Sequence, residues 1–160
     1  MYKQKGEIMI RAITSSDTSE VIEMMRVFYN SPAVHSNGSE EIFKSDVAAC
    51  IGDCPFLEGL VFIESADSTD IAGYAMLAKS FSTEFGTPCI WVEDIYIKPE
   101  HRGKGFGKEL FVYLKQNYPA HAIRLEVEEE NENAVGLYKK SGFKVLPYME
   151  MIKTVDSNTL

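Results

Sequence analysis

Three glycines alternate along a short basic loop, and this loop is the part of the sequence best suited to hold an anion. It follows a strand-like stretch that ends at Lys98 and Pro99. Glycine allows positive φ and close approach of a ligand to the backbone, and a helix N-terminus adds free N–H groups and a positive dipole end. The loop therefore predicts a diphosphate site. Its glycines and cations are Arg102, Gly103, Lys104, Gly105, Gly107 and Lys108.

Two common phosphate-binding loops do not fit this spacing. A Walker loop requires Ser or Thr after its lysine, whereas Glu109 follows Lys108. A dinucleotide fingerprint requires its third glycine at the position of Lys108. A glycine-rich turn that serves packing alone is the remaining alternative, and the three cations weigh against it.

Hydrophobic periodicity predicts an α/β protein with a mixed sheet flanked by helices. The predicted order is a strand, two helices, three strands, a helix, a strand, a helix and two short strands. The predicted strands are 8–13, 60–64, 71–79, 90–97, 122–128, 143–145 and 148–152. The predicted helices run from a cap at Ser16 or Asp17 to about Tyr29, from 39 to about 52, from 105 to 118 and from 132 to 140.

Composition excludes several classes of protein. The net charge of −8 disfavours general nucleic-acid binding, which relies on basic surface, and suits a cationic substrate. No apolar run approaches the roughly 20 residues that span a bilayer, and residues 1–10 lack a signal-like stretch, so we expect a cytoplasmic protein without membrane association. Cys50, Cys54 and Cys89 have no second cysteine pair or histidine cluster, so we expect free thiols and no metal site.

Two motifs resemble the GCN5-related N-acetyltransferase (GNAT) superfamily. Arg102-Gly103-Lys104-Gly105-Phe106-Gly107 matches the family's (Gln/Arg)-x-x-Gly-x-Gly acyl-CoA loop. The stretch from Asn131 to Phe143 is similar to the family's Asn-x-x-Ala-x-x-Leu-Tyr-x-x-x-Gly-Phe segment. The resemblance extends to the element order along nearly the whole chain.

This resemblance implies a single acetyltransferase domain over 1–160, with frayed tails at 1–7 and 154–160. Its sheet would be of the GNAT type, mixed and mostly antiparallel, with a V-shaped splay between the fourth and fifth strands and about four flanking helices. Homodimers are common in the family, so a homodimer is possible here.

The resemblance also assigns acetyl-CoA as a co-substrate and gives residues their roles. The pantetheine arm would pair with backbone at Ile95, Tyr96 and Ile97, and the pyrophosphate would lie on N–H groups of 103–108. Asn131, and less directly Asn133, would help to hold the cofactor. Tyr138 would stand near the thioester sulfur as a proton donor, with a packed aromatic residue as the alternative reading.

A narrower resemblance concerns the diamine (spermidine/spermine) N-acetyltransferase branch. Phe81-Ser82-Thr83 and the stretch from Trp91 to Pro99 match this branch locally, and its base is the glutamate that corresponds to Glu93. Glu126 is the rival base, and an ordered water is the third possibility. Strand alternation would place Asp94 on the face opposite Glu93.

The favoured function is therefore transfer of acetyl from acetyl-CoA to a primary amine by direct attack in a ternary complex. The favoured acceptor is a small polyamine or aminoalkyl compound. The alternatives are acetylation of a protein N-terminus or lysine, and a non-catalytic acyl-CoA sensor. An open groove would favour the peptide acceptor, and a cleft closed by the loop 32–38 would disfavour it.

Overall fold

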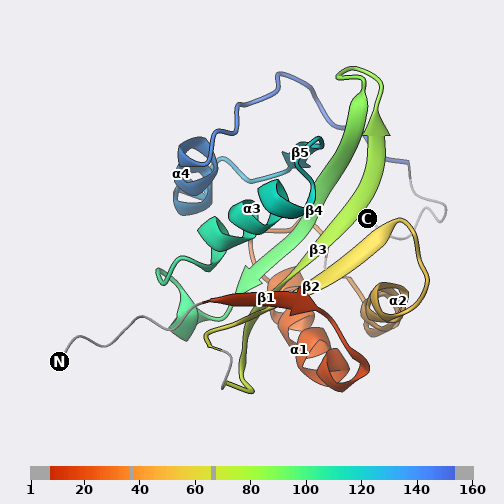
Figure 1. Cartoon of the computed structure of the whole chain (residues 1–160), viewed down its shortest axis with the longest axis vertical. Helices are drawn as coiled ribbons and strands as arrows, with labels where there is room; N and C mark the ends of the chain where they lie inside the picture. The colour runs from red at the N-terminus through yellow and green to blue at the C-terminus, as the bar shows by residue number, and fades with distance from the viewer. Residues whose placement is uncertain (1–7, 37, 66–67, 154–160) are drawn as a thin grey trace.

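The computed structural model describes residues 8–36, 38–65 and 68–153 (Figure 1). The tails predicted at 1–7 and 154–160 lie outside the described residues. The strands are β1 (Met9–Ala12), β2 (Leu57–Ile63), β3 (Ile71–Ser82), β4 (Thr87–Ile97) and β5 (Ala122–Leu125). The helices are α1 (Thr18–Tyr29), α2 (Glu40–Ile51), α3 (Phe106–Asn117) and α4 (Glu132–Lys140), with 3₁₀ turns η1 (Ser15–Asp17) and η2 (Pro99–His101).

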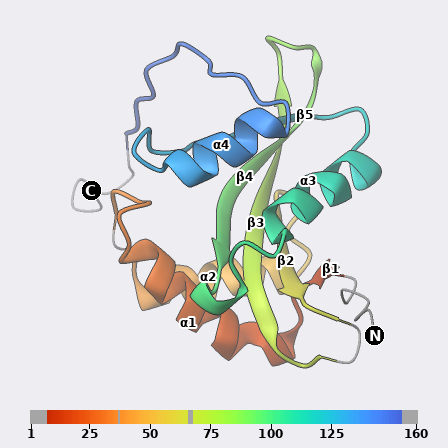
Figure 2. The same ribbon diagram turned by 90° about the vertical axis from the view of Figure 1, so that its left-hand side faces the viewer.

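The five strands form one sheet in the order β1-β2-β3-β4-β5. The pairs from β1 to β4 are antiparallel, and β4 pairs with β5 in parallel. Helices α1 and α2 cover one face and α3 covers the other, as Figures 1 and 2 show. The mixed, mostly antiparallel sheet predicted from the sequence is thereby confirmed.

Local sequence explains where the helices begin and which faces they bury. In α1 the buried residues Val21, Ile22, Met24 and Met25 recur at helical spacing and face the sheet. Helix α2 begins after Ser39, whose side chain accepts a hydrogen bond from the Ile42 N–H at 3.2 Å. Helix α4 packs on α3 through ring contacts such as that of Tyr138 with Phe111, whose centroids are 5.8 Å apart.

The predicted elements up to residue 140 are all present, with different ends in the sheet. Strand β3 extends to Ser82, and strand β4 begins at Thr87. The stretch between the predicted strands 71–79 and 90–97 is therefore mostly paired strand, with a tight turn at 83–86. Strand β5 ends at Leu125 rather than at residue 128.

The two strands predicted near the C-terminus are wrong. Residues 143–153 form no strand, and the exposed fractions of Val145, Met149 and Met151 are 82%, 88% and 88%. Their apolar alternation is typical of a strand, but a strand needs a partner edge, and the four-residue β5 offers little of one. Among the described residues, no helix is both long and apolar enough to cross a membrane.

Candidate active site

Strands β4 and β5 separate part-way along their length. Their parallel register runs from Cys89 and Ala122 to Val92 and Leu125, and there it stops. Strand β4 continues to Ile97, while the chain after β5 leaves the sheet (Figure 2). We call the opening between residues 93–97 and residues 126–128 the fork; it is the predicted splay between the fourth and fifth strands.

A β-bulge in β4 lies at the start of the fork. Val92 pairs with Leu77 and Asp94 pairs with Met76, so Glu93 is an extra residue without a partner in β3. A bulge bends its strand and changes the direction of the side chain at the extra residue. Glu93 therefore occupies a special backbone position at the point where β4 and β5 part.

The bulge also shifts the alternation of β4. Ile90 and Val92 lie in the core beneath α3, and so do Ile95 and Ile97, although 92 and 95 are an odd number of residues apart. The rule that successive residues point to opposite faces therefore does not hold across the bulge, and it cannot be used to place Asp94 relative to Glu93. The structure buries Asp94, with 3% of its surface exposed, so it does not line an open cleft.

Both candidate bases stand at the fork. Glu93 is exposed at the bulge, and partial burial of its carboxylate, followed by the charge of Glu150, raises its pKa. Glu126 directly follows the last paired residue of β5. Partial burial, a hydrogen bond with Glu150 and repulsion by Glu150 and Glu93 raise the pKa of Glu126 to about 7.

Sequence reasoning missed Glu150. It lies on the C-terminal segment that was predicted as a strand, and no local motif connects it with the fork. The segment reaches the tip of the β3–β4 hairpin, where the Tyr148 hydroxyl donates to Glu84 at 2.8 Å. Three carboxylates, Glu93, Glu126 and Glu150, therefore influence one another at the fork and give it a negative charge.

The basic loop has the geometry that an anion requires. Gly103 and Gly105 adopt positive φ of 74° and 105°, and a Cβ at either position would meet nothing within 4 Å. Gly105 is the N-cap of α3 and, having no side chain, caps none of the N–H groups of the first turn. Arg102, Lys104 and Lys108 are exposed around it. The predicted residues therefore fit the diphosphate of a coenzyme A.

Gly107 differs from the other two glycines of the loop. It lies within α3, and a Cβ there would come 2.7 Å from the Leu137 Cδ2 atom of α4. Its missing side chain thus allows α3 and α4 to pack closely.

Four of the predicted cofactor-binding residues are engaged within the chain. The Arg102 Nε donates to the Ile97 carbonyl at 3.0 Å, so this carbonyl already has a partner. The Arg102 guanidinium also lies over the ring of Tyr96, 5.9 Å from its centroid. Glu64, at the end of β2, accepts from the Lys104 Nζ at 2.9 Å.

The second motif forms α4 and its start. Asn131 caps α4, since its side chain accepts from the Ala134 N–H at 3.2 Å, while Asn133 is exposed in the first turn. Tyr138 is 7% exposed, and burial raises its pKa. A tyrosine hydroxyl is already protonated at neutral pH, so Tyr138 is in the form that a proton donor requires, and its raised pKa makes it a weaker acid.

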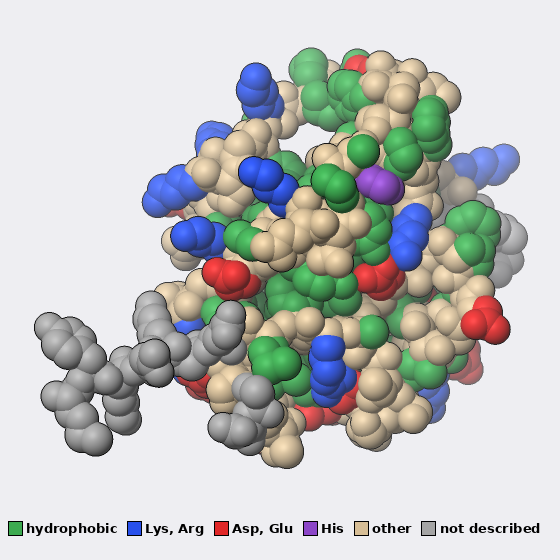
Figure 3. Space-filling view, in the orientation of Figure 1, with side chains coloured by type: hydrophobic (Ala, Val, Ile, Leu, Met, Phe, Trp, Pro, Cys, Tyr) green, Lys and Arg blue, Asp and Glu red, His purple; other side chains and the backbone are tan. Residues whose placement is uncertain are grey.

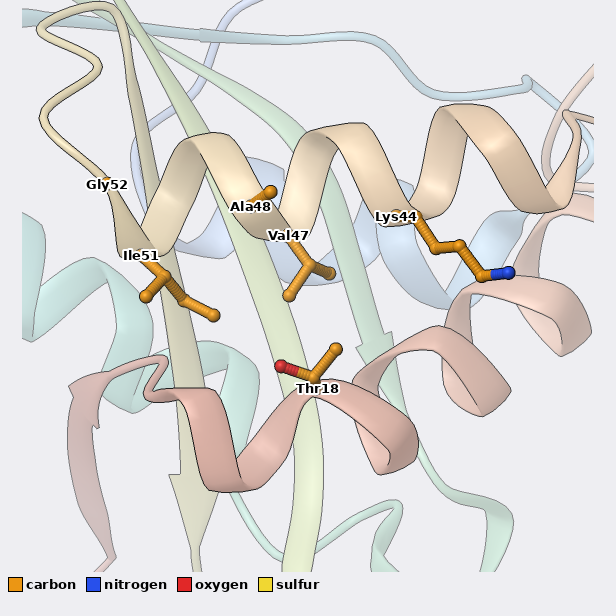
Figure 4. A pocket seen from close by; sticks show the side chains of 6 residues that line it. All are labelled: Thr18, Lys44, Val47, Ala48, Ile51 and Gly52. Carbon is orange, nitrogen blue, oxygen red and sulfur yellow. The ribbon is translucent and has the colours of Figure 1, made fainter.

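Basic side chains gather near this location, whereas a groove on the surface lies elsewhere. Figure 3 shows Lys and Arg side chains gathered on the side of the molecule where α3 and α4 lie. A groove of about 320 Å³ between α1 and α2 is separate from these residues (Figure 4). It is lined by Thr18, Lys44, Val47, Ala48, Ile51 and Gly52, none of which is a predicted site residue.

Comparison with known proteins agrees with the fold. The family model described as "Acetyltransferase (GNAT) family" matches residues 22–143. Thialysine N-epsilon-acetyltransferase of Bos taurus is 31% identical over an alignment of 153 residues, and the match covers 89% of this chain and 88% of the relative. Spermine/spermidine N(1)-acetyltransferase of Bacillus subtilis is 23% identical over an alignment of 148 residues, and the match covers 86% of this chain and 88% of the relative.

A solved structure shows the same fold at low identity. The aminoglycoside N-acetyltransferase AAC(6')-Iy in complex with CoA has a TM-score of 0.76 at 12% identity, with 98% of this chain and 100% of that chain covered. The fold and the two motifs define an acetyltransferase of the acyl-CoA-binding class. The chain belongs to the acetyltransferase (GNAT) family and is an enzyme of that family, whose members use acetyl-CoA.

Proposed function

We propose that the enzyme transfers acetyl from acetyl-CoA to a primary amine of a small polyamine or aminoalkyl compound, by direct attack in a ternary complex. The observation that carries the proposal is the position of Glu93 and Glu126 at the fork, above an open glycine loop with three cations. Two relatives whose names specify small amine acceptors support the choice of substrate.

Acetyl-CoA supplies a reactive thioester carbonyl, and the chain must prepare the amine and the leaving group. A free alkylamine has a pKa near ~10.4, so almost all of it is protonated at pH 7. Glu93, directly or through water, would accept the ammonium proton. The pKa values of Glu93 and Glu126 are both raised, so both are stronger bases than an ordinary carboxylate, and the position at the bulge favours Glu93. The charges of Glu126 and Glu150 would attract the cationic acceptor to the fork.

Other groups would serve the carbonyl and the sulfur. A backbone N–H near Ile95 would donate to the carbonyl oxygen as negative charge develops on it. The Tyr138 hydroxyl would give a proton to the leaving thiolate.

We propose that acetyl-CoA is held by the end of β4, the glycine loop and the start of α4. The free edge of β4 at Ile95, Tyr96 and Ile97 would pair with the pantetheine arm, once Arg102 releases the Ile97 carbonyl. The diphosphate would lie on the backbone from 103 to 108. The full set is Ile95, Tyr96, Ile97, Arg102, Gly103, Lys104, Gly105, Phe106, Gly107, Lys108, Asn131 and Asn133.

A contact beside the fork favours a small acceptor over an extended peptide. The loop between α1 and α2 reaches the segment after β5, where His35 Nε2 lies 2.5 Å from Glu128 Oε1. This contact joins the two segments beside the fork and would narrow the access that an extended peptide needs. A small flexible amine needs no open groove of that kind.

The test combines an acceptor panel with two matched variants. The enzyme is assayed with acetyl-CoA and spermidine, spermine, diamines, thialysine, lysine peptides and peptide N-termini, with thiol release as the readout. We expect turnover on the small amines, and a loss of kcat of about 100-fold or more in Glu93→Gln. Glu100→Gln, on the exposed 3₁₀ turn η2, is the control.

Two results would contradict the proposal. Turnover of peptides with none on small amines would exclude the proposed substrate class. A normal kcat in Glu93→Gln together with a large loss in Glu126→Gln would transfer the base role to Glu126.

A further inference from the structure

A buried carboxylate lies directly behind the bulge. Asp94 is 3% exposed, and its two carboxylate oxygens have separate donors: the Tyr29 hydroxyl at 3.0 Å from Oδ1 and the Tyr74 hydroxyl at 3.0 Å from Oδ2. Tyr29 is the last residue of α1, and Tyr74 lies in the middle of β3. Three elements therefore meet at one side chain.

Aromatic packing fixes the two donor rings. Tyr74 is completely buried, and its ring centroid lies 6.2 Å from that of Tyr96. The Tyr29 ring lies 5.2 Å from Phe43 of α2 and 5.3 Å from Phe28. Because packed rings in a dense core cannot swing freely, the hydroxyls hold Asp94 in one orientation.

An aspartate at this position is costly, and substrate binding does not account for it. Burial, with the charges of Asp46 and Glu93, raises the pKa of Asp94 to about 6 against the lowering effect of the two tyrosines. A buried carboxylate without a cationic partner is unfavourable, and the two tyrosine donors offset only part of this cost. Both oxygens are occupied and enclosed, so the acceptor amine cannot use them.

The position of Asp94 in the chain indicates another role. It is the residue that immediately follows Glu93, and it re-enters the β3 ladder after the bulge. We propose that Tyr29, Tyr74 and Asp94 form a clamp that fixes the bulge and so positions Glu93 at the fork. Asp94 is then a positioning residue for the acetyl transfer, and this inference rests on the proposed role of Glu93 as the base.

The clamp also connects the bulge with the loop between α1 and α2, which contacts the segment after β5. The loop after Tyr29 carries His35, which contacts Glu128 beside the fork. A displacement of the end of α1 would therefore be transmitted through the Tyr29 hydroxyl to the bulge. A base misplaced by about 1 Å can lose about 100-fold in rate.

The experiment is a double-mutant cycle. Asp94→Asn, Tyr29→Phe and Tyr74→Phe are each made in the wild-type enzyme and in Glu93→Gln, and kcat, KM, CoA affinity and unfolding midpoints are measured. Tyr118→Phe is the control. The Tyr118 hydroxyl also donates to a partly buried carboxylate, that of Glu58, but this pair lies away from the fork.

We expect Asp94→Asn to lower kcat about 10- to 100-fold, and each tyrosine variant about threefold or more, with CoA affinity unchanged. In the Glu93→Gln background the same changes should alter kcat less than about twofold, because the base they position is absent. Tyr118→Phe should leave kcat unchanged in both backgrounds.

The outcomes separate this inference from the proposed function. If Glu93→Gln retains full kcat, the base assignment fails and the clamp has nothing to position. If Glu93→Gln is impaired but the clamp variants lower kcat equally in both backgrounds, the clamp inference alone is overturned. Unchanged kcat in all three clamp variants, with only the unfolding midpoint lowered, would show a structural role. Should Asp94→Asn fail to fold, the tyrosine variants, which delete one hydroxyl each, still decide the question.

Discussion

Replacing Asp94 with asparagine should produce a stability difference that changes with pH in a direction set by the burial of this carboxylate. The pKa of Asp94 is raised from 3.8 to about 6 in the folded chain. One pKa unit is worth about 1.36 kcal/mol, so ionisation of Asp94 destabilises the folded state by about 3 kcal/mol in total. Because the folded pKa is the higher one, the folded state is free of this penalty below pH 3.8 and loses about 3 kcal/mol of stability as pH rises through about 6.

The assay compares urea unfolding of the wild-type protein and Asp94→Asn from pH 4.5 to pH 8. Over this range the stability of the wild type should fall by about 2 kcal/mol relative to the variant. The rest of the total effect is lost below pH 4.5, where Asp94 of the unfolded chain already titrates. Common titrations of other groups cancel in the difference. The variant also loses hydrogen-bond strength to its tyrosines, which shifts the whole difference curve without changing its slope.

Asp70→Asn is the matched control, because Asp70 is exposed in the turn before β3. The difference measured for this variant gives the baseline of the assay for removal of an exposed aspartate. Parallel pH curves for the wild type and Asp94→Asn, or a difference that moves in the opposite direction, would refute the account of a destabilised buried carboxylate.

Three further variants, with Gly136→Ala as a control for one of them, test other parts of the site and the fold. Tyr138→Phe should lower kcat about tenfold or more while CoA affinity stays within twofold, because only the leaving thiolate loses a donor; an unchanged rate of thiol release would contradict this role. Gly105→Ala should weaken CoA binding in calorimetry and destabilise the fold by about 1–2 kcal/mol, since φ is 105° there. Gly136→Ala, in open space on α4, should do neither. Asp17→Asn should lose about 2 kcal/mol at pH 7, because the hydrogen bond from Arg11 lowers the pKa of Asp17 to about 2. That stability is present above pH 3.8 and lost as pH falls through 2, so the wild type and the variant should converge in acid.

Features fixed by local spacing could be predicted from the sequence. The glycines at 103 and 105 mark backbone that needs positive φ, and both adopt it directly before α3. Asn131 caps the helix that the second motif predicts. Each of these depends on residues within one helical turn, which a single sequence displays.

Features made by long-range contacts could not be predicted. The bulge at Glu93 is a mismatch between β3 and β4, and it shifts the alternation by which Asp94 was placed. The donors to Asp94 stand 20 and 65 residues away in the chain. The apolar alternation of 143–152 predicts strands, but pairing depends on a neighbouring edge that this pattern does not specify.

The central claim is that the fork accepts the thioester arm of acetyl-CoA while the loop from Gly103 to Lys108 holds its diphosphate. The most direct test is a titration of the ¹⁵N-labelled enzyme with coenzyme A, followed by amide chemical shifts. The account predicts saturable binding with the largest shifts at 95–97 and 103–108. No saturable binding, or shifts confined to the groove between α1 and α2, would contradict it.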